Sequence, residues 1–261
     1  MNTQMRTAVI TGAAQGLGRV TAETLADAGF AVMLLDLQPL DAIVTELRAK
    51  GHTAHGLSGD IADEAFVQQA AAEVALTMGS AEVLVNNAGI SQIIPAEQLT
   101  AAQWRRVMDV NLLGPFLLCR EFGRQMLAKG RGSIINVASV ASFTASPGNV
   151  NYCATKAYER VMCEALAMEL EGTGVTVQAL CPGFTHTEFH DRASIDKTVG
   201  IPAWAWMEAD RVVRESLEAA HAGGPVVVIP GKRYQAIVLA LRYMPQWVRR
   251  TLQQRYGKAR T

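Results

Sequence analysis

The sequence predicts one α/β domain, a doubly wound parallel sheet of about seven strands with helices on both faces. Short β-branched runs alternate with stretches whose apolar residues recur every three or four positions, which indicates strands followed by helices. The runs are apolar at consecutive positions, as in strands covered on both sides. They are TAVIT (7–11), AVMLLD (31–36), TAHGLSG (53–59), EVLVNN (82–87), SIINVAS (133–139), VTVQAL (175–180) and VVVIP (226–230).

The chain has 261 residues, 49% of them apolar, which suffices for a sizeable core. No repeat or long Pro/Gly-rich linker divides it. We therefore expect one three-layer domain over residues 1–231, including a substrate segment at 184–207, and a basic amphipathic extension over 232–261. Pro245 is expected to break or kink that extension.

Lys plus Arg and Asp plus Glu both total 24, so the formal net charge is zero and nothing favours a nucleic-acid partner. The distribution is uneven, because after Glu218 the chain has no acidic residue. Its cations there are Lys232, Arg233, Arg242, Arg249, Arg250, Arg255, Lys258 and Arg260. The four cysteines show no C-x-x-C spacing, and neither a signal peptide nor an apolar run of about 18 residues is evident. We expect a cytoplasmic protein that does not cross a membrane.

A glycine-rich turn, TGAAQGLG (11–18), follows the first predicted strand and opens a helix. Gly12, Gly16 and Gly18 allow a tight turn in which backbone N–H groups approach a pyrophosphate at the helix N-terminus. The spacing G-x-x-x-G-x-G differs from the common G-x-G-x-x-G, so an ordinary strand-to-helix turn is the alternative. The turn predicts a Rossmann-type dinucleotide site that includes Gln15 and Leu17.

Asp36 closes the second predicted strand, about 20 residues after the glycines. A carboxylate there accepts hydrogen bonds from the ribose hydroxyls of adenosine and repels a 2′-phosphate. Leu37 follows it and positions 13–15 hold no basic residue, so a partner for that phosphate is missing. We expect NAD, with NADP less favoured. An exposed strand-end carboxylate or a helix cap is the alternative.

Tyr152 and Lys156, in YCATK (152–156), share one face of a predicted helix, because residues four apart are neighbours there. A tyrosine titrates at about 10. A nearby ammonium and the positive ring of an oxidised nicotinamide would stabilise the phenolate, so that Tyr152 could act as a general acid or base. The pair alone is weak evidence, since a surface lysine often lies beside a half-buried tyrosine.

Other polar residues stand where predicted strands end. NNAG (86–89) ends the fourth strand, Ser139 the fifth and Pro182–Gly183 the sixth, and Asn111 lies in the helix after the fourth. Open α/β sheets bind ligands at these carboxyl ends. Taken together, TGAAQGLG, Asp36, Asp60, NNAG, Asn111, Ser139, YCATK and PGFTHT (182–187) make residues 5–230 resemble the short-chain dehydrogenase/reductase family.

The resemblance implies an oxidoreductase that moves a hydride between a nicotinamide and a secondary alcohol or ketone, without a metal. It implies that Tyr152 exchanges the proton and Ser139 binds the substrate oxygen. Lys156 would hold the nicotinamide ribose and lower the pKa of the tyrosine, and Asn111 would keep a water in the proton relay. The further cofactor contacts it implies are Asp60 and Ile61 at the adenine, then Asn87, Ala88, Gly89, Pro182, Gly183, Thr185 and Thr187, the last at the carboxamide.

Alternatives remain open. Ser139 could merely cap a strand end, Asn111 could be a helix-interior residue, and NNAG could be an ordinary turn. A nucleotide-binding sensor or scaffold on the same fold is the second hypothesis, although the intact Ser139, Tyr152 and Lys156 argue against it. His186 and His190 have helical metal-pair spacing, but they follow Pro-Gly in a predicted loop without a third ligand, so we expect no metal site.

The segment 184–207 contains Phe189, Ile195, Ile201, Trp204 and Trp206, and we expect it to cover the nicotinamide and favour an apolar or aromatic substrate. The alternative places Trp204 and Trp206 in the core. The basic extension differs from the short C-terminal strand common in tetrameric members of the family. We expect it to pack on the protein's own body or on a second subunit of a homo-oligomer, dimer or tetramer. Contact with an anionic membrane surface is the other interpretation.

Overall fold

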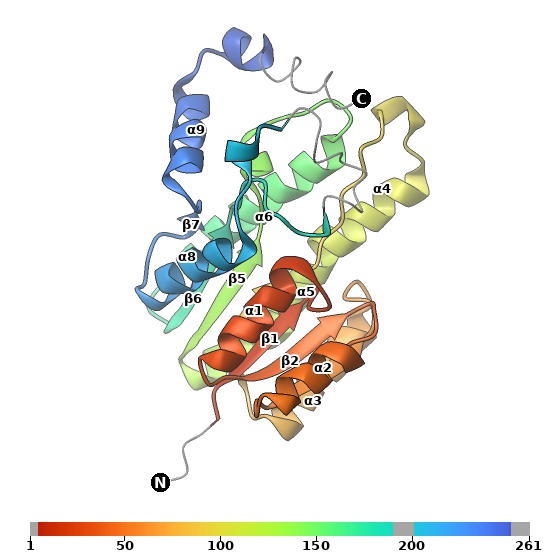
Figure 1. The fold of residues 1–261 in the computed structure, drawn as a ribbon, viewed down its shortest axis with the longest axis vertical. Helices are drawn as coiled ribbons and strands as arrows, with labels where there is room; N and C mark the ends of the chain where they lie inside the picture. Colours follow the sequence, from red (N-terminus) through yellow and green to blue (C-terminus); the bar gives the residue numbers. More distant parts are fainter. Residues whose placement is uncertain (1–4, 190–200, 252–261) are drawn as a thin grey trace.

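The computed structural model describes residues 5–189 and 201–251, and its centre is one seven-stranded sheet (Figure 1). The strand order is β3-β2-β1-β4-β5-β6-β7, and every neighbouring pair is parallel. The fold class predicted from the sequence is therefore confirmed. The strands are β1 (Thr7–Thr11), β2 (Ala31–Asp36), β3 (Ala54–Ser58), β4 (Ala81–Asn86), β5 (Gly132–Val137), β6 (Val175–Leu180) and β7 (Val227–Val228).

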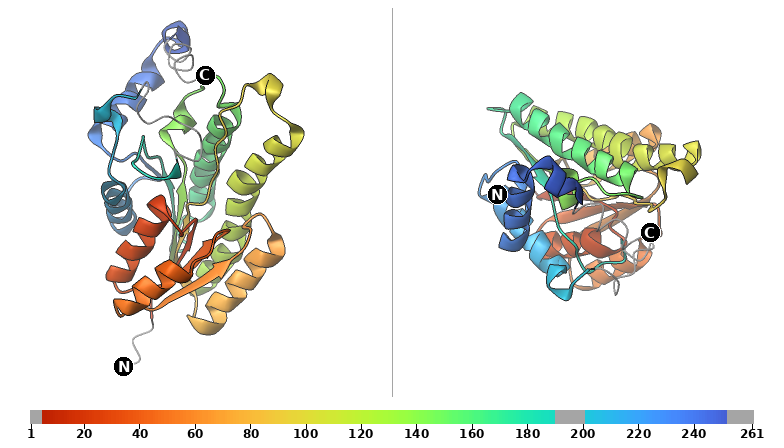
Figure 2. Two further views of the ribbon diagram at one scale, coloured as in Figure 1. Left: turned by 45° about the vertical axis from the view of Figure 1, so that its right-hand side comes forward. Right: turned by 90° about the horizontal axis from the view of Figure 1, so that it is seen from above.

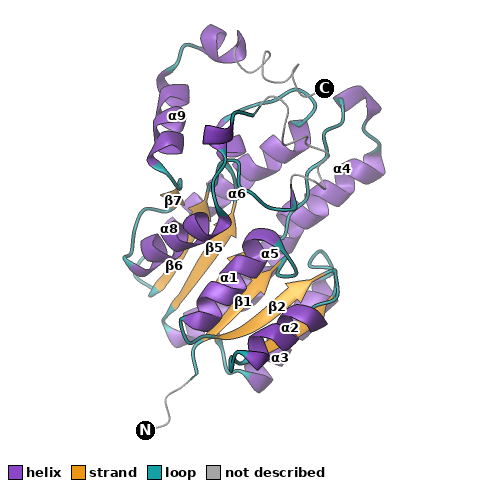
Figure 3. Cartoon of the chain, in the orientation of Figure 1, coloured by secondary structure: helices purple, strands orange, loops and turns teal. Residues whose placement is uncertain are grey.

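Helices connect these strands and cover both faces of the sheet (Figures 2 and 3). They are α1 (Gly16–Asp27), α2 (Asp41–Ala49), α3 (Glu64–Thr77), α4 (Ala101–Met108), α5 (Gly114–Lys129), α6 (Val150–Glu169), α8 (Ala209–His221) and α9 (Lys232–Tyr243). Short helical turns add η1 (Ala96–Gln98), the π-helix η2 (Asp109–Leu113), η3 (Val140–Phe143) and η4 (Ala203–Ala205). None of the described helices has the length and apolar character needed to cross a membrane.

The alternation of side chains along the strands divides the core into two layers. In β1, Val9 packs with α3, α5 and α6, whereas Ala8 and Ile10 pack with α1, α2 and α8. Strand β2 repeats the pattern, with Met33 on the first side and Leu34 on the second. All residues of β1 and β2 are buried, which explains why these strands are apolar at consecutive positions.

The strand order reverses between β1 and β4, where the chain leaves one half of the sheet for the other. Connections on either side of such a switch point run in opposite directions, so a crevice opens at the carboxyl ends of the strands. The glycine turn follows β1 and the sequence NNAG overlaps the end of β4. The fold thus brings these two predicted elements to the same crevice.

The start of the basic extension packs on the protein's own body. In α9, Tyr234 and Val238 are buried, and the Tyr234 hydroxyl donates to the Ala205 carbonyl at 2.6 Å and accepts from the Phe184 backbone N–H at 3.0 Å. The helix ends at Tyr243, two residues before Pro245. Arg255, Lys258 and Arg260 lie outside the described residues.

Candidate active site

A cavity of about 1030 Å³ lies at the carboxyl ends of the strands. Its wall contains nearly all the site residues predicted from the sequence. These are Gly12, Gln15, Gly16, Leu17, Asp36, Asp60, Ile61, Asn87, Ala88, Gly89, Ser139, Tyr152, Lys156, Pro182, Gly183, Thr185 and Thr187. Gly18 and Asn111 do not line the cavity, because each lies behind the wall and supports it.

The glycine turn leaves no room for side chains. Gly12 and Gly16 have φ values of 64° and 56°, in the left-handed region that favours glycine. A Cβ on Gly18 would stand 2.1 Å from the Gly12 carbonyl oxygen, and a Cβ on Gly12 would stand 2.8 Å from Asn87 Nδ2. The turn therefore presents bare backbone at the N-terminus of α1, a cradle that suits a pyrophosphate.

Asn87 and Thr11 hold this turn against the end of β4. The Asn87 side chain donates from Nδ2 to the Thr11 carbonyl at 2.9 Å and to the Gly12 carbonyl at 3.2 Å. In return, Thr11 Oγ1 accepts from the backbone N–H groups of Asn87 and Ala88 at 3.0 and 2.9 Å. Asn87 thus braces the cradle as well as lining it, and the role of Thr11 was not predicted.

Asp36 stands at the cavity wall and its side chain is anchored. Oδ2 accepts from the Ala14 N–H at 2.9 Å, and Oδ1 accepts from the Gln38 N–H at 2.9 Å. Each carboxylate oxygen has further lone pairs, so both can still accept hydrogen bonds from a ligand. Leu37, the next residue, is 64% exposed and offers no positive charge. The residues at this end therefore fit a ribose with free hydroxyls.

Asp60 forms an ion pair that the sequence analysis did not anticipate. Arg106 Nη1 lies 2.5 Å from Asp60 Oδ2, and both residues line the cavity. Ile61, beside it, is buried against Gly114, where a Cβ would meet the isoleucine side chain at 2.7 Å. Because α4 carries Arg106, this helix is tied to the predicted adenine end of the cavity.

Asn111 is fully buried in the π-helix η2, between α4 and α5. Its Nδ2 donates to the Ile90 carbonyl at 2.9 Å and to Thr155 Oγ1 at 3.1 Å, and its Oδ1 accepts from the Ile90 N–H at 2.9 Å. Single π turns inside helices often occur at functional sites. Here the turn lets one side chain connect the segment after β4 to helix α6.

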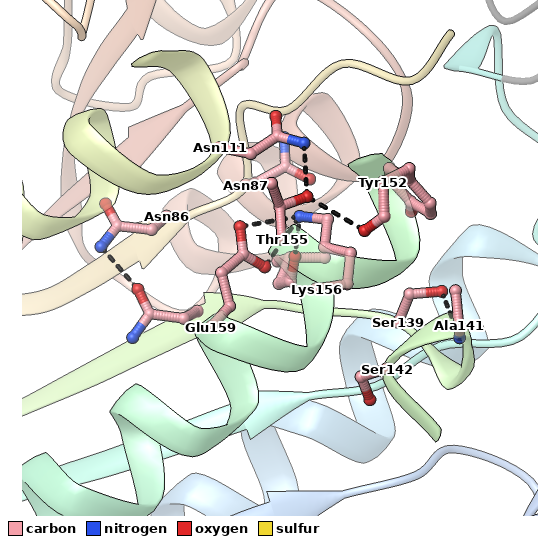
Figure 4. Close-up of polar contacts among 12 residues, drawn as sticks. Asn86, Asn87, Asn111, Ser139, Ala141, Ser142, Tyr152, Thr155, Lys156 and Glu159 are labelled. Atoms are coloured by element: carbon pink, nitrogen blue, oxygen red, sulfur yellow. Dashed lines mark hydrogen bonds and ion pairs between the residues drawn. The ribbon is translucent and has the colours of Figure 1, made fainter. Parts of the chain in front are cut away.

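Ser139 and Tyr152 come from different elements and contact each other at the cavity wall. Ser139 caps η3, where its Oγ accepts from the Ala141 N–H at 3.1 Å, and Tyr152 lies in the first turn of α6 (Figure 4). Burial raises the pKa of Tyr152, a hydrogen bond with Ser139 lowers it, and the negative charge of Glu159 raises it again, so the net shift is upward. The upward direction is set by burial, and the lowering by Lys156 that the resemblance implies stays a prediction.

The Lys156 ammonium is hydrogen-bonded to groups other than Tyr152. Its Nζ donates to the Val137 carbonyl at 2.8 Å and to Glu159 Oε1 and Oε2 at 3.0 and 2.8 Å, and it lies 5.8 Å from the centroid of the Tyr152 ring (Figure 4). Glu159 is 2% exposed. Burial raises the pKa of this carboxyl to about 7, against the lowering effect of Lys156. Glu159 was not predicted from the sequence, because a glutamate one turn beyond a lysine usually marks an exposed helix face.

The other end of the cavity is apolar. Phe189 lies near Tyr152, with ring centroids 5.7 Å apart. The further apolar side chains there come from the segment after β6, from η4 and from α9, and are Phe184, Trp204, Ile237, Val238 and Leu241. Trp204 is 55% exposed, so it does not belong to the core, whereas Trp206 packs on the Phe184 and His186 rings. The contribution of α9 to this wall was not predicted.

No three His, Cys, Asp or Glu side chains are grouped for a metal ion within residues 5–189 and 201–251. His186 stacks on Trp206, with centroids 4.8 Å apart, whereas His190 and Ile195 lie outside the described residues. Cys153 and Cys181 are buried beside the site. Burial raises the pKa of Cys181 to about 11, which keeps this thiol protonated.

Comparisons with known proteins agree with this geometry. Residues 6–198 match the family model described as short chain dehydrogenase. A D-threitol dehydrogenase from Mycolicibacterium smegmatis is 36% identical over 190 residues, covering 72% of this chain and 73% of the relative. A 3-oxoacyl-acyl-carrier-protein reductase from Staphylococcus aureus is 36% identical over 192 residues, covering 72% and 78%.

Two solved structures share the fold. A gluconate 5-dehydrogenase from Burkholderia cenocepacia, in complex with NADP and tartrate, superposes with a TM-score of 0.81 at 29% identity, covering 88% of this chain and 95% of that one. A short chain dehydrogenase/reductase from Burkholderia phymatum, in complex with NAD, gives 0.82 at 27% identity, with 97% of each chain covered. These two neighbours bind different nicotinamide cofactors, so they do not decide between NAD and NADP.

Proposed function

The chain belongs to the short-chain dehydrogenase/reductase family of oxidoreductases, and on this premise we propose that it is an NAD-dependent enzyme acting on an apolar or aromatic secondary alcohol or ketone. One observation carries the proposal. Ser139, Tyr152 and Lys156 stand in the wall of the same cavity as the glycine turn and Asp36. The proposed proton-transfer group and the proposed dinucleotide cradle therefore line the same cavity.

The cavity wall fits a nicotinamide dinucleotide. The bare backbone of the glycine turn would hold the pyrophosphate, Asp36 the adenosine ribose, and Thr187 the carboxamide. A Cβ on Gly16 would stand 3.3 Å from the Thr187 side chain, so Thr187 lies directly beside the glycine turn. When bound, the nicotinamide would supply the hydride chemistry. The Asp36 carboxylate, with the apolar Leu37 beside it, supports NAD over NADP.

Tyr152 is proposed to exchange the proton. During oxidation its phenolate would accept the hydroxyl proton of the substrate, and during reduction its hydroxyl would donate one to the carbonyl oxygen. Ser139, which is hydrogen-bonded to Tyr152, would donate to the same oxygen and stabilise negative charge on it. Lys156 would hold the nicotinamide ribose and lower the pKa of Tyr152 in the cofactor complex, an effect that opposes the burial described above.

Asn111 is proposed as a positioning residue. Both hydrogens of its Nδ2 are used by Ile90 and Thr155, and one lone pair of Oδ1 by Ile90. Oδ1 keeps one lone pair and lies close to Gly89, where a Cβ would meet Asn111 Oδ1 at 3.5 Å and Lys156 Nζ at 3.4 Å. A water held there would join Lys156 to the buried end of a proton relay.

The substrate class follows from the apolar end of the cavity. Aromatic and aliphatic side chains favour a ligand with apolar surface, since each buried methylene contributes about 0.8 kcal/mol. Phe189 supplies aromatic surface beside Tyr152, and Trp204 adds an aromatic side chain to the same cavity wall. We therefore propose an apolar or aromatic ketone or secondary alcohol in preference to a small charged hydroxy acid.

We also propose the division into a domain over residues 1–231 and an extension over 232–261, and a homo-oligomeric state. Helices α5 and α6 carry exposed apolar side chains that a second copy of the chain would cover. These are Phe116, Leu127, Tyr158, Val161 and Met168.

The experiment is a substrate panel that compares wild type with Tyr152→Phe by the absorbance of reduced nicotinamide. We expect turnover of apolar ketones by the wild type, and a loss of about 10²- to 10⁴-fold in kcat for the variant. Tyr158→Phe, on the exposed side of the same helix, is the matched control and should leave kcat unchanged. Equal activity of Tyr152→Phe and wild type would contradict the catalytic assignment.

A sensor or scaffold that binds nucleotide without turnover is the second candidate, because the cavity wall that fits a dinucleotide would serve it equally well. The same panel discriminates the two functions. Binding of NAD by wild type without turnover of any alcohol or ketone would support the sensor, and comparable turnover of charged hydroxy acids and apolar ketones would remove the proposed substrate class.

A further inference from the structure

We propose that Glu159 is a positioning residue of the proton-transfer machinery, whose carboxylate fixes the Lys156 ammonium and offsets its charge, so that Lys156 and Glu159 together set the acidity of Tyr152. This inference rests on the proposed function, in which Tyr152 exchanges the proton. It adds a residue that none of the motifs recognised in the sequence contains.

Helix α6 places Tyr152, Lys156 and Glu159 on one buried face. Lys156 follows Tyr152 by four residues and Glu159 follows Lys156 by three, so the three side chains share one face of the helix. That face is buried: the side chains of Lys156 and Glu159 are 4% and 3% exposed. Ion pairs of this spacing usually lie in solvent, where each contributes little. In the present case both charges stand in the interior beside the reacting group.

The N–H donors of the Lys156 ammonium are already engaged by protein acceptors. An ammonium has three N–H donors. The described contacts of Lys156 Nζ are with the Val137 carbonyl oxygen and the two Glu159 oxygens, at 2.8 to 3.0 Å. To donate to a ribose hydroxyl as well, Nζ must share or release one of these contacts. Glu159 therefore competes directly with the cofactor for Lys156.

The described groups around Glu159, apart from Lys156, are uncharged. Besides Lys156, the titratable groups whose charge couples to Glu159 are Tyr152 and Cys163 of α6, Cys119 of α5 and Cys181 after β6. Burial raises the pKa of all three thiols, so they stay neutral. Nearby β4 and β5 contribute the uncharged Asn86 and Asn136, hydrogen-bonded to Cys119 and Cys163. Because these thiols and amides are uncharged, Lys156 is the one cation in this set of groups.

The electrostatic consequence has a definite sign. A carboxylate near a phenol disfavours the phenolate, and a nearby ammonium favours it. In the structure the charge of Glu159 raises the pKa of Tyr152, after burial and against Ser139. Because burial raises the pKa of Glu159 to about 7, the carboxyl is ionised above that pH and neutral below it. Removing its charge should let the ammonium act on Tyr152 without opposition.

The test replaces Glu159 by Gln, which keeps the shape and one acceptor oxygen but removes the charge. Tyrosines are labelled with ¹³C at Cζ, the Tyr152 signal is assigned by its loss in Tyr152→Phe, and the signal is followed against pH in the free protein. We expect Tyr152 in Glu159→Gln to begin to ionise at a pH about one unit below wild type. Glu159→Asp, which keeps the charge, should stay close to wild type.

Glu164→Gln is the matched control, the same substitution on the same helix. Glu164 is 41% exposed in its side chain and pairs with Arg160. This variant should titrate like wild type. If Glu159→Gln does not fold, the wild-type protein still decides, because the Tyr152 signal should then show a step at the pH where Glu159 ionises. An unchanged Tyr152 titration in a folded Glu159→Gln, or the absence of that step, overturns the proposal.

Kinetics give a second readout where wild type turns over an alcohol. The acid limb of kcat/KM for oxidation should move to lower pH in Glu159→Gln and not in Glu164→Gln. A purely structural role would lower the melting temperature and leave this limb in place. The NMR titration needs no turnover, so an inactive wild type would count against the proposed function alone, and an unmoved Tyr152 signal against the role of Glu159 alone.

Discussion

The two walls of the cavity are built in different ways. The proposed nucleotide wall consists of short turns directly after β1, β2 and β4, and partly buried hydrogen bonds that involve the side chains of Thr11, Asn87 and Asp36 hold its backbone in place. The substrate wall consists of apolar side chains from the segment after β6, from η4 and from α9. The first depends on where side chains are missing, and the second on which side chains are present. Substitutions should therefore affect the two walls unequally.

The largest effect is expected for Gly18→Ala. The new Cβ would stand 2.1 Å from the Gly12 carbonyl oxygen and 2.6 Å from Asn87 Nδ2, so the turn must move. We expect affinity for NADH to fall at least 100-fold, or about 2.8 kcal/mol. Fluorescence titration with NADH measures the change.

Gly123→Ala is the control for this prediction. Gly123 lies inside α5, where a Cβ would meet only Ile134 Cδ1, at 3.8 Å, an ordinary contact. The melting temperature of the Gly123→Ala protein should equal or exceed that of wild type, because alanine favours a helix over glycine by about 1 kcal/mol. NADH affinity of Gly18→Ala equal to that of Gly123→Ala would mean that the turn does not hold the dinucleotide.

Asp36→Ala should have the next largest effect, on cofactor choice. A hydrogen bond to a charged group contributes about 1.5–3 kcal/mol, so kcat/KM for NAD should fall by about 10- to 100-fold. The value for NADP should rise, because the negative charge facing its phosphate is gone. Steady-state kinetics with both cofactors measure the ratio. Asp41→Ala, an exposed carboxylate at the start of α2, should change neither value, and an unchanged ratio in Asp36→Ala would contradict the NAD assignment.

The same difference between the walls explains what the sequence could predict. Strands β1, β2 and β6 begin and end where expected and the others lie within two residues, because buried parallel strands show as unbroken apolar runs. The residues of the nucleotide wall could be placed together from the sequence because they follow strand ends at fixed spacing, and that they bind a nucleotide stays a prediction. Arg106 and Glu159 could not be placed in this way, because a single charged residue in a helix does not reveal whether it is exposed or meets a partner far away in the chain. Burial raises the pKa of Tyr152, and the charge of Glu159, which the sequence patterns did not single out, adds to that upward shift.

Leu241→Ala tests the substrate wall and should have a smaller effect. Leu241 lines the cavity from α9, whereas Leu239 on the same helix is 58% exposed and does not line it. Loss of apolar surface worth about 1 kcal/mol predicts a KM for an apolar ketone several-fold higher, with kcat nearly unchanged. Leu239→Ala should match wild type. Equal KM values for the two variants would place the substrate away from α9.

The last prediction concerns the basic extension, for which we expect no measurable binding to a membrane surface. Its first helix already uses Tyr234 and Val238 against the body, and Arg233 donates to the Trp204 carbonyl at 3.2 Å, so α9 holds the substrate wall in place. The described cations farther along are Arg242, Arg249 and Arg250. With this face of α9 occupied, we expect no flotation of the protein with anionic vesicles, even at low salt. Binding that weakens as salt rises would instead indicate a membrane contact, because screening removes attraction between exposed charges. The exposed side chains of Leu239, Tyr243 and Trp247 would then face the lipid, and the apolar end of the cavity would lie next to the membrane.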